Sequence, residues 1–103
     1  MAGESIKLRT ALKGDLLTVR ALLRHPMEVG RRRGADGASV PAHFITRVTC
    51  TLDGEVVLDA EWGGGIARDP YLSFEVAGAA AGQVLKLAWE DNQQGHDEAS
   101  TTL

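Results

Sequence analysis

Residues 44–62 read FITRVTCTLDGEVVLDAEW, and this stretch decides the fold. Apolar and polar side chains alternate on both sides of Asp53-Gly54, as in two strands that each have one face on a core. Asp-Gly is favoured in tight hairpin turns because both central residues need a positive φ. The stretch therefore predicts a β-hairpin, in which Ile45 faces outward. The side chains expected to face inward are Phe44, Val48, Cys50, Leu52, Val56, Leu58, Ala60 and Trp62.

The same alternation continues on both sides of this hairpin. Residues 6–12 and 17–23 predict a second hairpin, which ends before Pro26 because proline cannot donate to a strand ladder. Residues 72–76, 85–89 and 98–103 predict three more strands. Seven short strands, with turns between them and no amphipathic helix, predict an all-β fold: an immunoglobulin-like β-sandwich of about seven antiparallel strands.

The composition is that of an ordinary globular chain. The 103 residues suffice for one hydrophobic core, so we expect a single domain over residues 1–103. The formal net charge of −3 gives no support for binding to nucleic acid or to an anionic membrane. We interpret the triplet Arg31, Arg32 and Arg33 as part of a solvated loop, because longer basic runs are typical of nucleic-acid patches.

The first twenty residues bear on the cellular compartment of the protein. Lys7, Arg9, Lys13 and Asp15 leave no uninterrupted apolar stretch for a signal peptide or a membrane helix. The residues alone therefore predict a cytoplasmic protein.

The reactive side chains predict no catalytic, cofactor or metal site. Cys50 is the single cysteine, and its inward position in the alternation predicts a buried, inert thiol. His25, His43 and His96 lack the close spacing of paired metal ligands, so a metal site would have to be assembled by the fold. The carboxylates, Asp91 among them, are spread over turns and polar faces, as solubility requires.

The glycines and tryptophans are interpreted as structural. The run from Gly63 to Gly65 lacks the following Lys and Ser or Thr of a phosphate-binding loop, so it predicts a tight bend. Trp62 and Trp89 are expected to pack inward on the core.

Five segments of the chain together resemble the SoxZ family in order and spacing. They are HPMEVG at 25–30, PAHFI at 41–45, WGGGI at 62–66, PYLSF at 70–74 and WEDN at 89–92. No single segment would suffice, and it is their common order that carries the resemblance, from about Ile6 to the C-terminus.

The resemblance implies a subunit of the SoxYZ sulfur carrier complex of thiosulfate oxidation. In that heterodimer the partner, SoxY, holds sulfur intermediates on a cysteine near the end of a flexible C-terminal arm. This chain ends in ASTTL without a cysteine, so the sulfur attachment site is expected on the partner. The resemblance further implies that this subunit has no enzyme activity and no cofactor, supports SoxY, and offers docking surface to other Sox enzymes. It replaces the cytoplasmic expectation with periplasmic, after export with a signal-bearing partner.

Two segments are expected to contact that partner, the loop 26–41 and the turn 63–71. Met27 suits an adaptable contact and Tyr71 an anchor with a polar tip. The alternative is that the glycines and prolines of these segments only shape turns. An apolar interface of this kind also makes a homodimer of the isolated chain an expectation. The expected interface residues are Pro26, Met27, Phe44, Trp62, Tyr71 and Leu72.

Two other functions stay open. A free-standing immunoglobulin-like module for carbohydrate or adhesion should expose aromatic side chains for stacking, whereas aromatic residues are only 5 % of this chain. A thiol enzyme or thiol carrier acting through Cys50 would need that thiol exposed, with its pKa lowered by a neighbouring cation.

Overall fold

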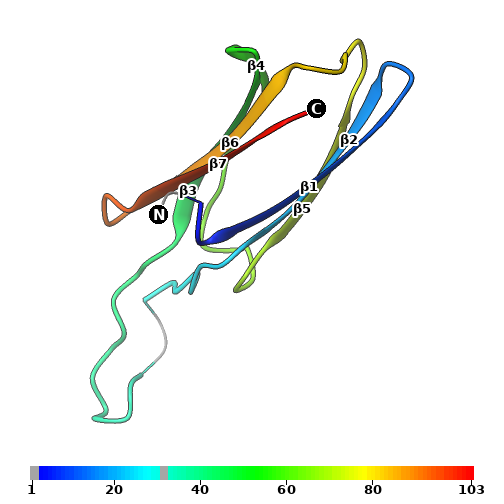
Figure 1. The fold of residues 1–103 in the computed structure, drawn as a ribbon. Helices are drawn as coiled ribbons and strands as arrows, with labels where there is room; N and C mark the ends of the chain where they lie inside the picture. Colours follow the sequence, from blue (N-terminus) through cyan, green and yellow to red (C-terminus); the bar gives the residue numbers. More distant parts are fainter. Residues whose placement is uncertain (1–2, 31–32) are drawn as a thin grey trace.

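Two antiparallel β-sheets pack face to face in the computed structural model of the chain, which describes residues 3–30 and 33–103 (Figure 1). The first sheet has the order β1-β2-β5, with β1 (Ile6–Lys13), β2 (Leu16–Leu23) and β5 (Tyr71–Val76). The second has the order β4-β3-β6-β7, with β4 (Glu55–Glu61), β3 (Ile45–Leu52), β6 (Val84–Asp91) and β7 (His96–Thr102). The chain changes sheet after β2, β4 and β5, so the prediction of an all-β, immunoglobulin-like sandwich of seven antiparallel strands is confirmed. The described residues include no helix that could cross a membrane.

Both predicted hairpins are present. β1 and β2 pair from Ile6 opposite Leu23 to Lys13 opposite Leu16. In the β3–β4 turn, Asp53 has a φ of 49° and Gly54 a φ of 81°, as the Asp-Gly signal requires. These two hairpins lie in different sheets, so the core forms where their inward faces meet.

The core lies between the sheets and consists mostly of branched aliphatic side chains. Along β2, buried positions alternate with exposed or half-buried ones, which is why its sequence could be read as a strand. Burying each large aliphatic side chain contributes about 1.5–3 kcal/mol to stability. The largest fully buried side chains are Leu17, Val19, Leu23, Ile45, Val48, Cys50, Leu85 and Leu87. Trp62 and Trp89 are half-buried and pack against this core, as expected.

Two inward–outward assignments were wrong, and both errors lie at β-bulges. Ile45 was expected outward but is fully buried, because the pairing of β3 with β6 shifts register between Ile45 and Arg47. Val56 was expected inward but is 61 % exposed, because the pairing of β3 with β4 shifts between Cys50 and Thr51. One extra residue in a strand reverses which face the following side chains occupy.

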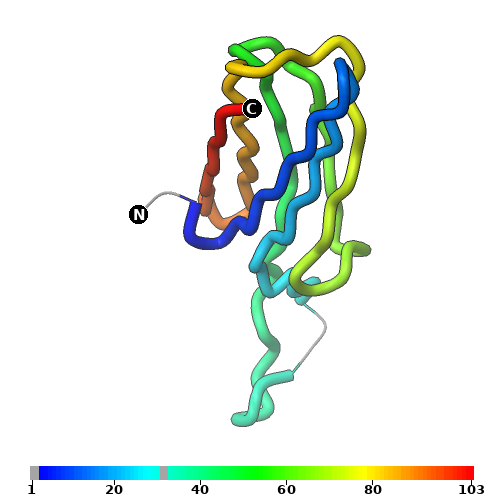
Figure 2. Tube along the Cα trace, turned by 45° about the vertical axis from the view of Figure 1, so that its right-hand side comes forward, coloured from blue at the N-terminus to red at the C-terminus, as the bar shows by residue number. Residues whose placement is uncertain are grey.

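The segment between β2 and β3 extends beyond the end of the sandwich (Figures 1 and 2). Its two ends are tied together, because the backbone N–H of Glu28 donates to the carbonyl of His43 and that of His43 donates to Glu28, both at 2.7 Å. Arg33 is exposed and donates to the carbonyl of Gly37 at 2.8 Å. Arg31 and Arg32, the other members of the arginine triplet, lie outside the described residues.

Cys50 is predicted to be unreactive in the folded protein. Its side chain is fully buried in β3, and burial raises the pKa of the thiol to about 11. Labelling with a thiol reagent at neutral pH should therefore be at least about a hundredfold slower in the native protein than in denaturant, since the thiolate is the reactive form. Equal labelling rates in both conditions would contradict this and reopen a thiol function.

Candidate functional site

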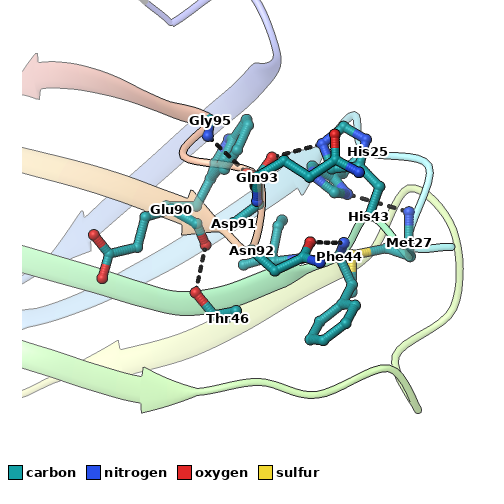
Figure 3. A network of polar contacts seen from close by, with 12 residues as sticks. His25, Met27, His43, Phe44, Thr46, Glu90, Asp91, Asn92, Gln93 and Gly95 are labelled. Carbon is teal, nitrogen blue, oxygen red and sulfur yellow. Dashed lines mark hydrogen bonds and ion pairs between the residues drawn. The ribbon is translucent and has the colours of Figure 1, made fainter. Parts of the chain in front are cut away.

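Three polar side chains from distant parts of the chain meet at the end of the sandwich from which the long loop leaves. His25 follows β2, His43 precedes β3, and Asp91 ends β6. The Nε2 atoms of His25 and His43 lie 3.0 Å and 2.8 Å from the same atom, Oδ2 of Asp91 (Figure 3). The fold thus brings together two histidines and an aspartate whose spacing in the sequence does not indicate a site. The third histidine, His96, lies apart from them and is exposed at the start of β7. We call these three residues the histidine–aspartate cluster.

Asp91 is the centre of this cluster. Its other carboxylate oxygen, Oδ1, accepts hydrogen bonds from the backbone N–H groups of Gln93 at 2.9 Å and Gly95 at 2.7 Å. Burial alone would raise the pKa of Asp91, but the hydrogen bonds from His25, His43, Gly95 and Gln93 outweigh it and lower the pKa to about 2. The expectation that Asp91 is a solvated turn residue was wrong, since it is only 8 % exposed.

The hydrogen-bond partners of His25 show which of its two ring nitrogens carries the proton. The backbone N–H of Met27 donates to Nδ1 of His25 at 3.1 Å, so Nδ1 is an acceptor and carries no proton. The proton of the neutral ring is then on Nε2, which donates to Asp91. His43 also donates through Nε2, because the ionised carboxylate can only accept, and its side chain is 34 % exposed at the mouth of the cluster.

The same geometry bears on whether the cluster holds a metal. Its three ligand atoms lie within 4.8 Å of one another, which is close enough for a metal ion to bridge them. A metal on Nε2 of His25 would move the ring proton to Nδ1, where it would face the N–H of Met27, so two donors would oppose each other. The cluster therefore suits a hydrogen-bonded lock better than a metal centre.

The histidine–aspartate cluster and its neighbours hold the two ends of the long loop between β2 and β3. Next to Asp91, Asn92 accepts from the backbone N–H of Phe44 at 2.8 Å and donates to the carbonyl of Ala42 at 3.0 Å (Figure 3). Thr46 donates its hydroxyl to the carbonyl of Glu90 at 3.2 Å. The end of β6 thus holds both the start and the end of the loop.

The residues expected at the partner interface gather at this same end of the sandwich, but their exposure differs. Met27 is buried, and its sulfur accepts from the backbone N–H of Ile45 at 3.4 Å, so it packs beneath the cluster. Tyr71 is 63 % exposed, and Pro26 is exposed as well. Phe44, Trp62 and Leu72 are half-buried and contact the core.

The two candidate segments touch each other through a residue that the sequence analysis passed over. A Cβ on Gly64 would lie 2.7 Å from Cγ1 of Val29, so the lack of a side chain at Gly64 permits this close approach. Val29 is also 41 % exposed. Its apolar side chain within a polar loop was the signal that could have identified it.

Removing the hydrogen bonds of the histidine–aspartate cluster should destabilise the protein. Asp91→Asn removes the charge that four donors share, and we expect a loss of about 2 kcal/mol in the free energy of unfolding at pH 7. Since the folded pKa is below the ordinary value of 3.8, this stabilisation is present above about pH 4 and is lost as the pH falls toward 2. Chemical denaturation as a function of pH measures both effects, and D91N should show a weaker acid dependence than the wild type.

Two variants sharpen that test. Gly95→Ala keeps every donor and acceptor, yet its Cβ would lie 2.5 Å from Oδ2 of Asp91, so it should destabilise the protein as D91N does. Asp59→Asn breaks only an exposed ion pair with Arg47 and should have a much smaller effect. Equal stability of D91N, G95A and D59N would show that the cluster contributes nothing.

Zinc is expected to leave the melting temperature unchanged. Because the N–H of Met27 favours the tautomer of His25 that cannot offer Nε2 to a metal, Zn²⁺ should gain no preference for the folded state. Thermal melts with and without zinc measure this, with chelator-treated protein as the control. A zinc-dependent rise that disappears in D91N would instead assign a metal to the cluster.

Comparison with known proteins agrees with the arrangement of these segments. The model of one family, described as sulphur oxidation protein SoxZ, matches residues 6–102, nearly the whole chain. No curated protein matches at a significant level. The matched range includes all three residues of the histidine–aspartate cluster and every residue expected at the partner interface. The chain therefore belongs to the SoxZ family and has a role in the sulfur oxidation pathway, in a family that associates with SoxY.

Proposed function

We propose that this chain is the non-catalytic subunit of a heterodimeric sulfur carrier in thiosulfate oxidation. It binds a SoxY-type subunit, whose C-terminal cysteine carries the sulfur intermediates. Membership of the SoxZ family supports this assignment, and the observation that carries the division of roles is the full burial of Cys50. A carrier thiol must reach several enzymes, and a thiol inside the sandwich core cannot do so.

The partner is proposed to bind the loop-end surface, which we define as Pro26, Val29, Phe44, Trp62 and Tyr71. Aromatic side chains with one face exposed are typical of interface anchors. The histidine–aspartate cluster holds the backbone beneath this surface, so little conformational entropy would be lost on binding. β5, which begins at Tyr71, pairs on one side only with β2 in the described sheet, so its outer edge offers backbone groups to a partner.

The proposed location is the periplasm, reached together with a partner that carries the export signal. The family resemblance alone supports this location. Cell fractionation with antibodies to both subunits tests it, and a pool of this chain confined to the cytoplasm would contradict it.

The carrier assignment is tested by recovering the complex. Pull-down of the tagged chain from periplasmic extract, followed by intact-mass analysis, should give a small partner in equal amount. That partner should carry extra sulfur mass on a C-terminal cysteine, while this chain keeps its unmodified mass. A sulfur adduct on Cys50, or no partner at all, would contradict the proposal.

The loop-end surface is tested by substitution at Tyr71, which is 63 % exposed. Tyr71→Ala should weaken the heterodimer by at least about tenfold, as expected for a central aromatic anchor. Val56→Ala, at a similarly exposed apolar residue in the β3–β4 hairpin, is the matched control and should leave the affinity unchanged. Titration calorimetry with the isolated partner measures both, and equal affinities would remove the loop-end surface from the interface.

A further inference from the structure

The outer face of the first sheet carries a group of cations that the net charge conceals. Lys7, Arg9 and Lys13 alternate on β1, and Arg20 lies on β2 directly opposite Arg9. All four are exposed, and we call them the cationic face. Glu75 of β5 is the one carboxylate on the same side of these strands, so this face has a local charge of about +3 in a chain of net charge −3.

These cations have no acidic partners within the described chain. No ion pair within 4.0 Å involves Lys7, Arg9, Lys13 or Arg20 in residues 3–30 and 33–103. On the outer face of the other sheet, by contrast, Arg47 pairs with Asp59 and Lys86 pairs with Glu98. The first sheet therefore presents unneutralised charge to solvent.

The cationic face is hollowed as well as charged. A groove of about 660 Å³ runs over β1 and β2. Two threonines and two aliphatic residues line it together with guanidinium and ammonium groups. Its lining residues include Arg9, Lys13, Leu16, Thr18, Arg20 and Glu75.

Protection of a sheet edge explains only part of this arrangement. Lysines on an edge strand discourage unwanted strand pairing, and β1 is an edge strand. Arg20, however, lies on the central strand of its sheet, where no edge needs protection. Like charges directly opposite each other destabilise a sheet, so the Arg9–Arg20 pair opposes folding without a compensating ion pair.

We propose that the cationic face docks an acidic polypeptide segment of a second protein, distinct from the SoxY-type subunit. Lys7 and Lys13 are six residues apart on one strand, a span of about 20 Å. An extended segment with carboxylates at alternate positions has the same repeat, whereas a small oxyanion would reach only one or two of the cations. The proposal rests on the carrier function proposed above, and it gives the chemistry by which a pathway protein recognises this subunit.

The polar character of the groove fits a transient partner. Exposed charges accelerate encounter and are screened by salt, while lasting interfaces are larger and more apolar. The loop-end surface and the cationic face thus offer two different kinds of contact on one subunit.

The test uses a fluorescent peptide of alternating glutamate and threonine, about eight residues long to cover the groove. Anisotropy with the full chain should show binding at an ionic strength of about 0.01 M that weakens several-fold at about 0.15 M. Arg9→Gln together with Arg20→Gln should weaken binding by about tenfold. Arg47→Gln with Lys86→Gln removes the same charge from the other sheet and should leave the affinity unchanged, and circular dichroism checks that both pairs fold.

Three results would overturn the proposal. They are equal affinities for the two variant pairs, displacement of the peptide by inorganic sulfate at equal concentration, and loss of peptide binding once the SoxY-type subunit is bound. The last would place that subunit on this face. Failure to recover a SoxY-type partner would overturn the carrier function instead, and it would leave the peptide measurement intact.

Discussion

The loop end of this molecule depends on the hydrogen bonds that the buried carboxylate of Asp91 accepts. Removing a charge from water has an unfavourable free energy, which is offset only when the buried charge is fully hydrogen-bonded. Here two donors come from the turn that follows β6, and two come from His25 and His43 on either side of the crossover between sheets. Every buried side-chain nitrogen and oxygen atom in the described part of the chain has a hydrogen-bond partner, including those of the histidine–aspartate cluster.

The strands could be predicted from the sequence because their physical cause is local. Alternation reports which side of a strand meets the core, and Asp53-Gly54 reports the turn between two strands. Ile45 and Val56 were misplaced because a period of two cannot reveal an inserted residue. A bulge arises from how two strands pair, and the sequence of one strand alone does not determine that pairing.

The histidine–aspartate cluster could not be predicted from spacing, because His25 and His43 lie 66 and 48 positions from Asp91. Their meeting depends on the order of strands, which brings the start of β3 beside the end of β6. A signal was nevertheless present. Three of the five segments that resemble the SoxZ family, at 25–30, 41–45 and 89–92, each contribute one residue to the cluster.

The net charge gives no information about single faces of the molecule, since a total averages over faces that partners meet one at a time. Alternation had already placed Lys7, Arg9 and Lys13 on one side of a strand, but only the register of β1 with β2 sets Arg20 beside Arg9. In the function proposed above, this subunit keeps one partner and releases the others. Apolar contacts on the loop end and solvated charges on an open sheet would differ in how fast they dissociate, so placing them apart would let one subunit meet both demands.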